Sequence, residues 1–100
     1  MINLYNTDCL SAMRTMDDDQ YDIAIVDPPY GIKTKNPFSG GLKNRIINSD
    51  TKIKHWDVAP SAEYFDELRR VSKQQIIWGG NYFDLPPTRC VICWDKCQPW

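Results

Sequence analysis

Residues 21–31 read YDIAIVDPPYG. The first six form a nearly continuous apolar and β-branched run, a pattern typical of a strand that is covered on both faces, as in a parallel sheet. Two consecutive prolines then end the run, because a proline has no N–H for a sheet ladder and restricts the residue before it. This stretch therefore predicts a buried strand at 21–26 with a rigid turn at its carboxyl end.

The segments around this strand alternate between strand and helix patterns. Asp8 follows an Asn-Thr pair and supplies cap chemistry for a helix, and Ser61 opens a segment that carries Phe65, Leu68 and Val71 on one helical face. The other predicted elements are strands at 2–5, 75–78 and 90–94 and helices at 9–16 and 61–73.

Strands joined through helices imply an α/β fold, with a partial, mostly parallel sheet and flanking helices. In such sheets ligands bind beyond the carboxyl ends of the strands. The turn at 27–31 is therefore expected at the functional edge.

Composition limits the class of protein. One hundred residues with 42% hydrophobic and 25% charged side chains make one small domain, and the net charge of −1 excludes a histone-like polycation. No apolar run is long enough to span a bilayer and no secretion signal opens the chain, so a cytoplasmic protein without a membrane partner is expected. The four cysteines are then expected to be reduced.

The turn at 27–30 combines three kinds of group that suit a planar amine. Its two prolines hold the Asp27 carboxylate, the free Pro28 carbonyl and the Tyr30 ring with little freedom left to lose. One exocyclic amine can donate to both acceptors while its ring stacks on the tyrosine, as an adenine N6 or a cytosine N4 amine could. The alternative is a rigid turn in which Asp27 only caps backbone N–H groups.

The stretch Asp27-Pro28-Pro29-Tyr30-Gly31 resembles the fourth motif of the S-adenosylmethionine-dependent DNA amino-methyltransferases. Asp at its first position is more typical of adenine-N6 enzymes, whereas cytosine-N4 enzymes more often carry Ser. Residues 4–10, LYNTDCL, are similar to the segment that precedes this motif in the permuted group of the family. Residues 61–83 look like the helix and strand that follow it.

This resemblance implies a Rossmann-like methyltransferase fold, S-adenosylmethionine as cofactor, and double-stranded DNA as substrate, with methyl transfer to adenine N6. Cytosine-N4 methylation remains an alternative, as does a noncatalytic nucleic-acid-binding domain of degenerate methyltransferase fold. The implied catalytic residues are Asp27, Pro28, Pro29 and Tyr30, and the implied cofactor contacts are Asp8, Cys9 and Asp27.

The chain departs from the family pattern because it lacks the glycine-rich FxGxG turn that approaches the cofactor's methionine portion. Only the permuted motif order, in which that turn comes last, is compatible with the 26 residues that precede Asp27. The resemblance therefore implies that residues 1–100 are the amino-terminal part of a catalytic domain and are inactive alone.

A polar loop without helix or strand periodicity is predicted at about 31–57. It is rich in basic residues and holds a single acidic one, Asp50, up to position 54. Such a loop beside a base pocket suits contacts to DNA phosphates, and the alternative is a solvated flexible loop. The expected DNA-binding residues are Lys33, Lys35, Lys43, Arg45, Lys52 and Lys54.

Two weaker signals lie near the carboxyl end. Cys90, Cys93 and Cys97 have a spacing that faintly fits zinc, but the only histidine, His55, is distant in sequence, so buried thiols and no metal are expected. A sheet that ends near Trp94 would leave an exposed edge, which predicts self-association into a homo-oligomer.

Overall fold

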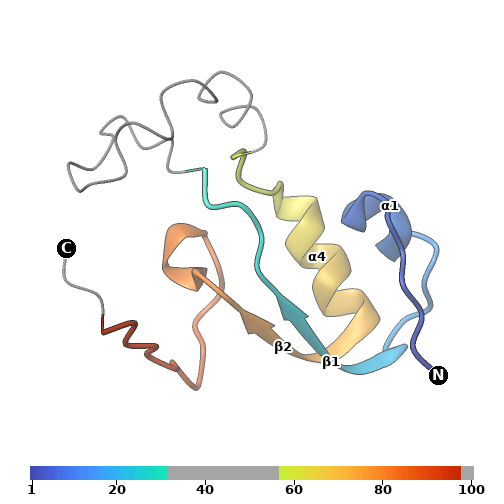
Figure 1. Cartoon of the computed structure of the whole chain (residues 1–100). Coiled ribbons are helices and arrows are strands. Elements are labelled where there is room, and N and C mark those ends of the chain that lie inside the picture. Colours follow the sequence, from blue (N-terminus) through green and yellow to red (C-terminus); the bar gives the residue numbers. More distant parts are fainter. Residues whose placement is uncertain (32–56, 98–100) are drawn as a thin grey trace.

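The computed structural model describes residues 1–31 and 57–97. Within these ranges the chain forms a small α/β structure with two parallel strands and two α-helices (Figure 1). The elements are α1 (Cys9–Met13), β1 (Tyr21–Val26), α4 (Ala62–Val71), β2 (Ser72–Ile77) and a short 3-10 helix, η1 (Gly80–Tyr82).

The sheet confirms the parallel arrangement expected from the strand and helix order. β1 and β2 pair in parallel with Val26 opposite Ile77. The ladder continues one residue further, where the Trp78 N–H donates to the Val26 carbonyl at 2.9 Å. Both strands therefore end at the same edge, and the segments that follow them leave the sheet side by side.

The helix α4 lies where its sequence pattern predicts it. Ser61 is the N-cap, and its hydroxyl accepts a hydrogen bond from the Tyr64 N–H. Phe65, Leu68 and Val71 are buried, as their spacing on one helical face requires. The helix ends at Val71, two residues before the predicted end, because Ser72 already has extended backbone angles and begins β2.

Both helices pack on one face of the sheet. The core consists of Met13 from α1 and of the three buried side chains of α4, against which Ala24, Val26 and Ile77 pack from the strands. On the opposite face Ile23 and Ile25 remain 51% and 64% exposed. The expectation that β1 is covered on both faces is therefore wrong for the described residues, because no described helix covers the second face.

Three other predicted elements also differ. Residues 2–5 and 90–94 are not strands, and Val91 and Ile92 are 83% and 75% exposed. A strand needs a hydrogen-bonded neighbour, and neither segment pairs with β1 or β2. The helix expected at 9–16 ends at Met13, after which Thr15 and Met16 donate to carbonyls three residues back, in tight turns.

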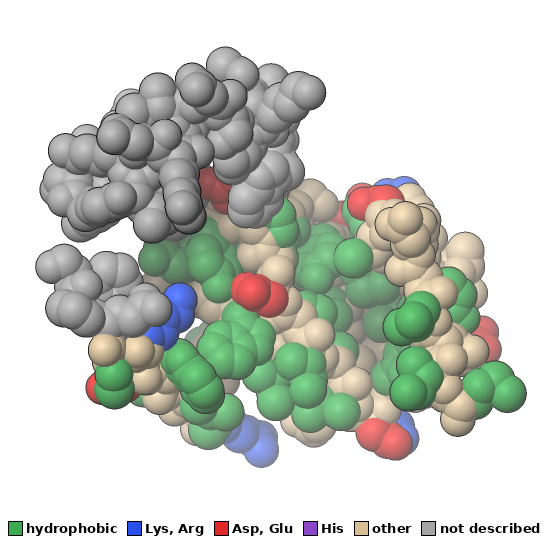
Figure 2. All heavy atoms as spheres, in the orientation of Figure 1, with side chains coloured by type: hydrophobic (Ala, Val, Ile, Leu, Met, Phe, Trp, Pro, Cys, Tyr) green, Lys and Arg blue, Asp and Glu red, His purple; other side chains and the backbone are tan. Residues whose placement is uncertain are grey.

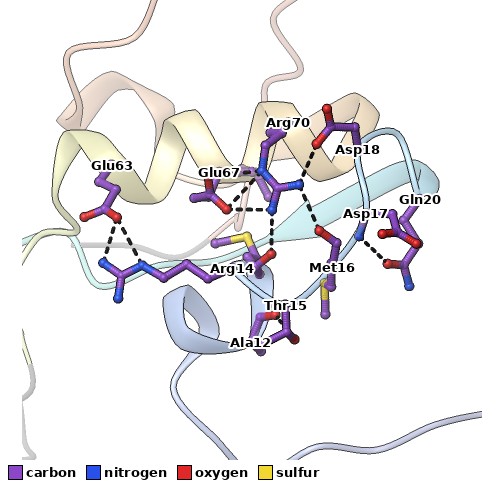
Figure 3. Close-up of polar contacts among 12 residues, drawn as sticks. Ala12, Arg14, Thr15, Met16, Asp17, Asp18, Gln20, Glu63, Glu67 and Arg70 are labelled. Carbon is purple, nitrogen blue, oxygen red and sulfur yellow. Dashed lines mark hydrogen bonds and ion pairs between the residues drawn. The ribbon is translucent and has the colours of Figure 1, made fainter.

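Arg70 joins the last turn of α4 to the end of α1 (Figure 3). Its guanidinium donates to the carbonyls of Met13 and Met16, each at 2.8 Å. It also forms ion pairs with Asp18 and Glu67, both at 2.7 Å. The hydrogen bonds to these two carboxylates hold the pKa of Arg70 above its ordinary value. One side chain thus adds hydrogen bonds to two carbonyls at and just beyond the end of α1, of which that of Met13 also accepts from the Met16 N–H.

Hydrophobic side chains cover much of the surface of the described residues (Figure 2). On the open sheet face they include Ile23, Ile25 and Ile76. None of the helices in residues 1–31 and 57–97 is long and apolar enough to cross a membrane.

Candidate functional site

An open cleft of about 530 Å³ lies at the carboxyl end of β1. Its walls come from the start of α1, the end of β1 with the turn that follows, and the amino end of α4. This volume is within the range of about 300–1,000 Å³ that is usual for small-molecule sites. The lining residues are Asp8, Cys9, Leu10, Ile25, Val26, Asp27, Pro28, Pro29, Val58, Pro60, Ser61 and Tyr64.

The cleft brings together residues that the sequence places far apart. The implied cofactor contacts Asp8, Cys9 and Asp27 all line it, and so do Pro28 and Pro29. Tyr30 does not line the cleft but is bonded to Asp27. Apolar walls with two carboxylates at the rim can hold a partly apolar ligand that carries hydrogen-bond donors.

Asp8 has a structural task as well as a place at the cleft. It is the N-cap of α1, and its Oδ2 accepts from the Ser11 N–H at 2.8 Å. This hydrogen bond lowers the pKa of Asp8 below its ordinary value of 3.8, so the side chain is a carboxylate at neutral pH. The cap chemistry expected from the sequence is confirmed for Asp8.

The Asp27 carboxylate is paired with the tyrosine of its own motif. The Tyr30 hydroxyl donates to Asp27 Oδ1 at 2.8 Å, and this bond raises the pKa of Tyr30 above its ordinary value. Pro28 between them is buried, whereas Asp27 is exposed. The motif thus presents one carboxylate whose orientation is already constrained.

Tyr82 lies against the ring of Tyr30. The two rings stack with centroids 4.8 Å apart and planes 20° from parallel. One face of Tyr30 is therefore occupied in this structure, so a base that stacks on Tyr30 would use the opposite face or displace Tyr82. Sequence reasoning missed this pair, since Tyr82 lies 52 positions away and only the parallel pairing of β1 and β2 brings it near.

Gly79 provides the close approach that this packing needs. Its φ is +65°, and a Cβ at this position would lie only 2.2 Å from Tyr30 Cε1. Both facts require glycine here, because other residues avoid positive φ and would clash with the ring. In the sequence, the glycine pair at 79–80 is a feature that could indicate a close approach of the backbone to another group. It does not show that this group is the Tyr30 ring.

The amino end of α4 adds Ser61 and Tyr64 to the cleft, two residues that sequence reasoning assigned only to the helix. Burial raises the pKa of the Tyr64 hydroxyl above its ordinary value, and the nearby Cys9 thiol contributes further. Tyr64 is therefore protonated at neutral pH and can donate a hydrogen bond beside the cleft.

The predicted basic loop begins and ends beside the cleft. The Gly31 N–H donates to Asp57 Oδ1 at 2.7 Å, so the described residues on either side of the loop are in contact. The six expected DNA-binding residues, Lys33, Lys35, Lys43, Arg45, Lys52 and Lys54, lie outside the described residues.

The cysteines do not form a metal site in the described part of the chain. Cys9, Cys90, Cys93 and Cys97 are free and exposed, so the expected burial of the last three is wrong. These three cysteines lie in a segment that is not a strand, and Trp94 between them contacts Trp78 without covering them. Among residues 1–31 and 57–97, no three His, Cys, Asp or Glu side chains lie close enough to hold a metal ion together.

Comparison with known proteins adds no assignment. No protein-family model, curated protein sequence or solved structure matches the chain. The motif residues and the cleft that they line are therefore the basis for a functional proposal.

Proposed function

We propose that this chain is the amino-terminal part of an S-adenosylmethionine-dependent DNA methyltransferase that modifies adenine N6. The proposal includes a Rossmann-like methyltransferase fold, of which the two parallel strands and two helices would form one portion. The observation that carries it is the cleft at the carboxyl end of β1, where Asp8 and Cys9 meet the Asp27-Pro28-Pro29 turn. The sequence resemblance implies the same residues as cofactor contacts and catalytic residues of one methyl-transfer reaction.

The cleft fits the cofactor in size and chemistry. Leu10, Val26 and Val58 offer apolar walls for an adenine ring, and the Asp8 carboxylate offers an acceptor for its polar groups. The helix cap uses Oδ2 of Asp8, and the carboxylate also interacts with the Ser11 side chain and the Leu10 N–H, but the residue is exposed and can accept from a ligand as well. S-adenosylmethionine would supply the methyl group when bound.

The turn at 27–30 suits the target amine. Tyr30 holds Oδ1 of Asp27, so the second carboxylate oxygen and the Pro28 carbonyl are the acceptors proposed for the two N–H groups. If both N–H groups donate to these acceptors, the amine nitrogen could become pyramidal, and its lone pair would be localised for attack on the methyl carbon. The N–C bond would form as the methyl–sulfur bond breaks, the cofactor would leave as a neutral thioether, and the methylated nitrogen would release one proton to solvent. Asp27 acts through position and negative charge, which stabilise the positive charge that develops on the nitrogen.

The basic composition of the loop predicted at about 31–57 supports DNA as the proposed substrate. Its basic residues lie in a segment whose two ends meet beside the cleft through the Gly31–Asp57 hydrogen bond. Phosphate contacts from this segment would hold the duplex near the cleft while the target base is flipped out of the stack.

Calorimetric titration of S-adenosylmethionine into the product of the complete reading frame that encodes this chain tests the cleft. We expect saturable binding of one cofactor per chain, weakened roughly tenfold or more by Asp8→Asn, which keeps the helix cap but removes the charge. Asp17→Asn is the matched control, because Asp17 is an exposed carboxylate that does not line the cleft. Binding that is absent, or equally weak in both variants, would contradict the assignment.

Methyl transfer is measured on the product of the complete reading frame that encodes this chain, with unmethylated duplex DNA. We expect Asp27→Ala to abolish transfer while salt-sensitive DNA binding persists. Nucleoside analysis of the product separates N6-methyladenine from N4-methylcytosine, the alternative with the same chemistry. DNA binding with no transfer by the wild-type protein would favour the noncatalytic nucleic-acid-binding alternative.

A further inference from the structure

The turn after β2 supports the motif that follows β1. The two strands end together, with Val26 opposite Ile77 and the Trp78 N–H bonded to the Val26 carbonyl at 2.9 Å. The chain then reverses within η1, where the Tyr82 N–H donates to the Gly79 carbonyl at 2.9 Å. Gly79 and Tyr82 thus lie on one short turn that begins directly after Trp78, the residue hydrogen-bonded to β1.

Both residues of this turn contact the Tyr30 ring. Gly79 leaves no space for a Cβ beside Cε1 of that ring, and Tyr82 stacks on it at 4.8 Å. Phe83 adds a tilted contact at 6.1 Å and packs in turn on Phe65 of the core at 5.1 Å. The ring of Tyr30 is therefore connected through aromatic contacts to the buried core.

The Tyr30 hydroxyl links the packed ring to the Asp27 carboxylate. It donates to Asp27 Oδ1 at 2.8 Å, so the position of the ring determines where the carboxylate can accept a second hydrogen bond. Asp27 itself is exposed and would otherwise choose among several rotamers. A carboxylate held in one orientation loses less entropy when an amine binds.

We propose that Tyr82 is a positioning residue that acts through Tyr30, stacking on its ring so that the Tyr30 hydroxyl orients the Asp27 carboxylate toward the target amine. The part of this inference that concerns the amine rests on the proposed function. The part that concerns Tyr30 and Asp27 can be tested without it.

The first test follows Tyr30 directly, by NMR of the chain with 13C-labelled tyrosine rings. In Tyr82→Ala we expect the ring signals of Tyr30 to lose the shift caused by stacking. We also expect its hydroxyl to titrate closer to the ordinary pKa of 10.0. Tyr82→Phe should restore both, because it keeps the ring. Tyr21→Ala is the control, since Tyr21 lies at the opposite end of β1.

The second test measures base recognition by fluorescence anisotropy, with a labelled duplex that carries one adenine opposite an abasic site. We expect Tyr82→Ala to reduce the preference for this duplex over a fully paired one by roughly 2- to 10-fold, the range of an aromatic pair. Tyr82→Phe should retain the preference, and Tyr21→Ala should leave it unchanged.

The two tests separate the possible failures. Unchanged Tyr30 signals and titration in Tyr82→Ala, with the α4 amide signals intact, would overturn the positioning role whatever the protein does. A wild-type chain without any preference for the unpaired adenine would instead refute base binding by the motif. In that case altered Tyr30 signals in Tyr82→Ala would still support the structural coupling of the three residues.

Discussion

At the level of single residues, Asp8 and Asp27 show how one short side chain serves both local structure and a candidate site. Asp8 caps α1 through Oδ2, and Asp27 accepts from Tyr30 through Oδ1. Both residues are exposed and line the cleft. Satisfying one oxygen within the protein orients the other, which is the condition for selective recognition of a donor.

The capping role of Asp8 predicts a pH dependence. The Ser11 N–H stabilises the carboxylate, so the folded-state pKa of Asp8 lies below 3.8. The stability that the Asp8 carboxylate gives to the folded protein is therefore present above pH 3.8 and is lost as the pH falls through the folded-state pKa. We expect Asp8→Ala to be less stable than the wild type in urea at pH 7 and the difference to vanish at acidic pH.

Asp8→Asn provides the comparison for this prediction. Asparagine caps a helix without a charge. The difference in the free energy of unfolding between Asp8→Asn and Asp8→Ala should therefore not change on acidification. An Asp8→Ala defect that persists unchanged below pH 3 would show that Asp8 does not stabilise the fold through its carboxylate.

Gly79 gives a second prediction at this scale. Alanine at this position would need a positive φ and would place its Cβ against the Tyr30 ring. We expect Gly79→Ala to cost about 1–3 kcal/mol in the free energy of unfolding. Gly80→Ala is the matched control, because its Cβ would meet only Leu85 Cδ1 at 3.5 Å. Equal losses in the two variants, measured by urea unfolding, would contradict the close contact.

At the level of elements, α1 depends on α4. The helix α1 has only five residues, fewer than a helix needs to be stable alone in water. Met13 is buried against α4, and Arg70 binds the carbonyls of Met13 and Met16 beyond the last helical turn. The position of Asp8 and Cys9 at the cleft therefore depends on contacts made at the far end of both helices.

The role of Arg70 can be measured against its neighbour. Arg70→Gln removes the bonds to α1, whereas Arg69→Gln removes only an exposed pair with Asp66 within α4. We expect Arg69→Gln to lower the free energy of unfolding by under about 1 kcal/mol. Arg70→Gln should lower it by more, which a larger drop in the urea midpoint would show. Similar midpoints for the two variants would show that the carbonyl contacts do not hold α1.

For the whole molecule, the main feature is a sheet with one covered and one open face. α1 and α4 cover the side of Ala24, Val26 and Ile77, while Ile25 and Ile76 remain exposed next to each other on the other side. Exposed apolar patches of this kind mark association surfaces or aggregation-prone surfaces in soluble proteins. Within residues 1–31 and 57–97, each strand pairs on one side only, so its other edge could pair with another strand.

We expect the isolated chain to self-associate through this open face with a second copy of itself. Ile25→Lys should shift the weight-average mass in light scattering toward the monomer, because a charge at the centre of an apolar contact is costly to bury. Leu4→Lys is the control, since Leu4 is also an exposed apolar residue, 91% against 64% for Ile25, but lies outside the sheet. A monomeric wild-type chain at micromolar concentration, or equal effects of the two variants, would contradict this expectation.

Much of the local structure follows from the sequence itself. The apolar spacing of Phe65, Leu68 and Val71 predicts α4, and Ser61 and Asp8 are the caps that their side chains predict. The strand at 21–26 and the turn after it follow from a β-branched run that meets two prolines. These features depend on interactions within a few residues, so they can be inferred without knowledge of the fold.

The tertiary structure alone decided the remaining features. The runs at 2–5 and 90–94 are not strands, although they are more apolar than β2, because a strand exists only where a neighbour accepts its hydrogen bonds. In the same way, only the parallel pairing of β1 with β2 brings Tyr82 and Gly79 to Tyr30. The sequence alone determined the local elements and the chemistry of the motif. The long-range pairing of two strands determined which side chains surround it.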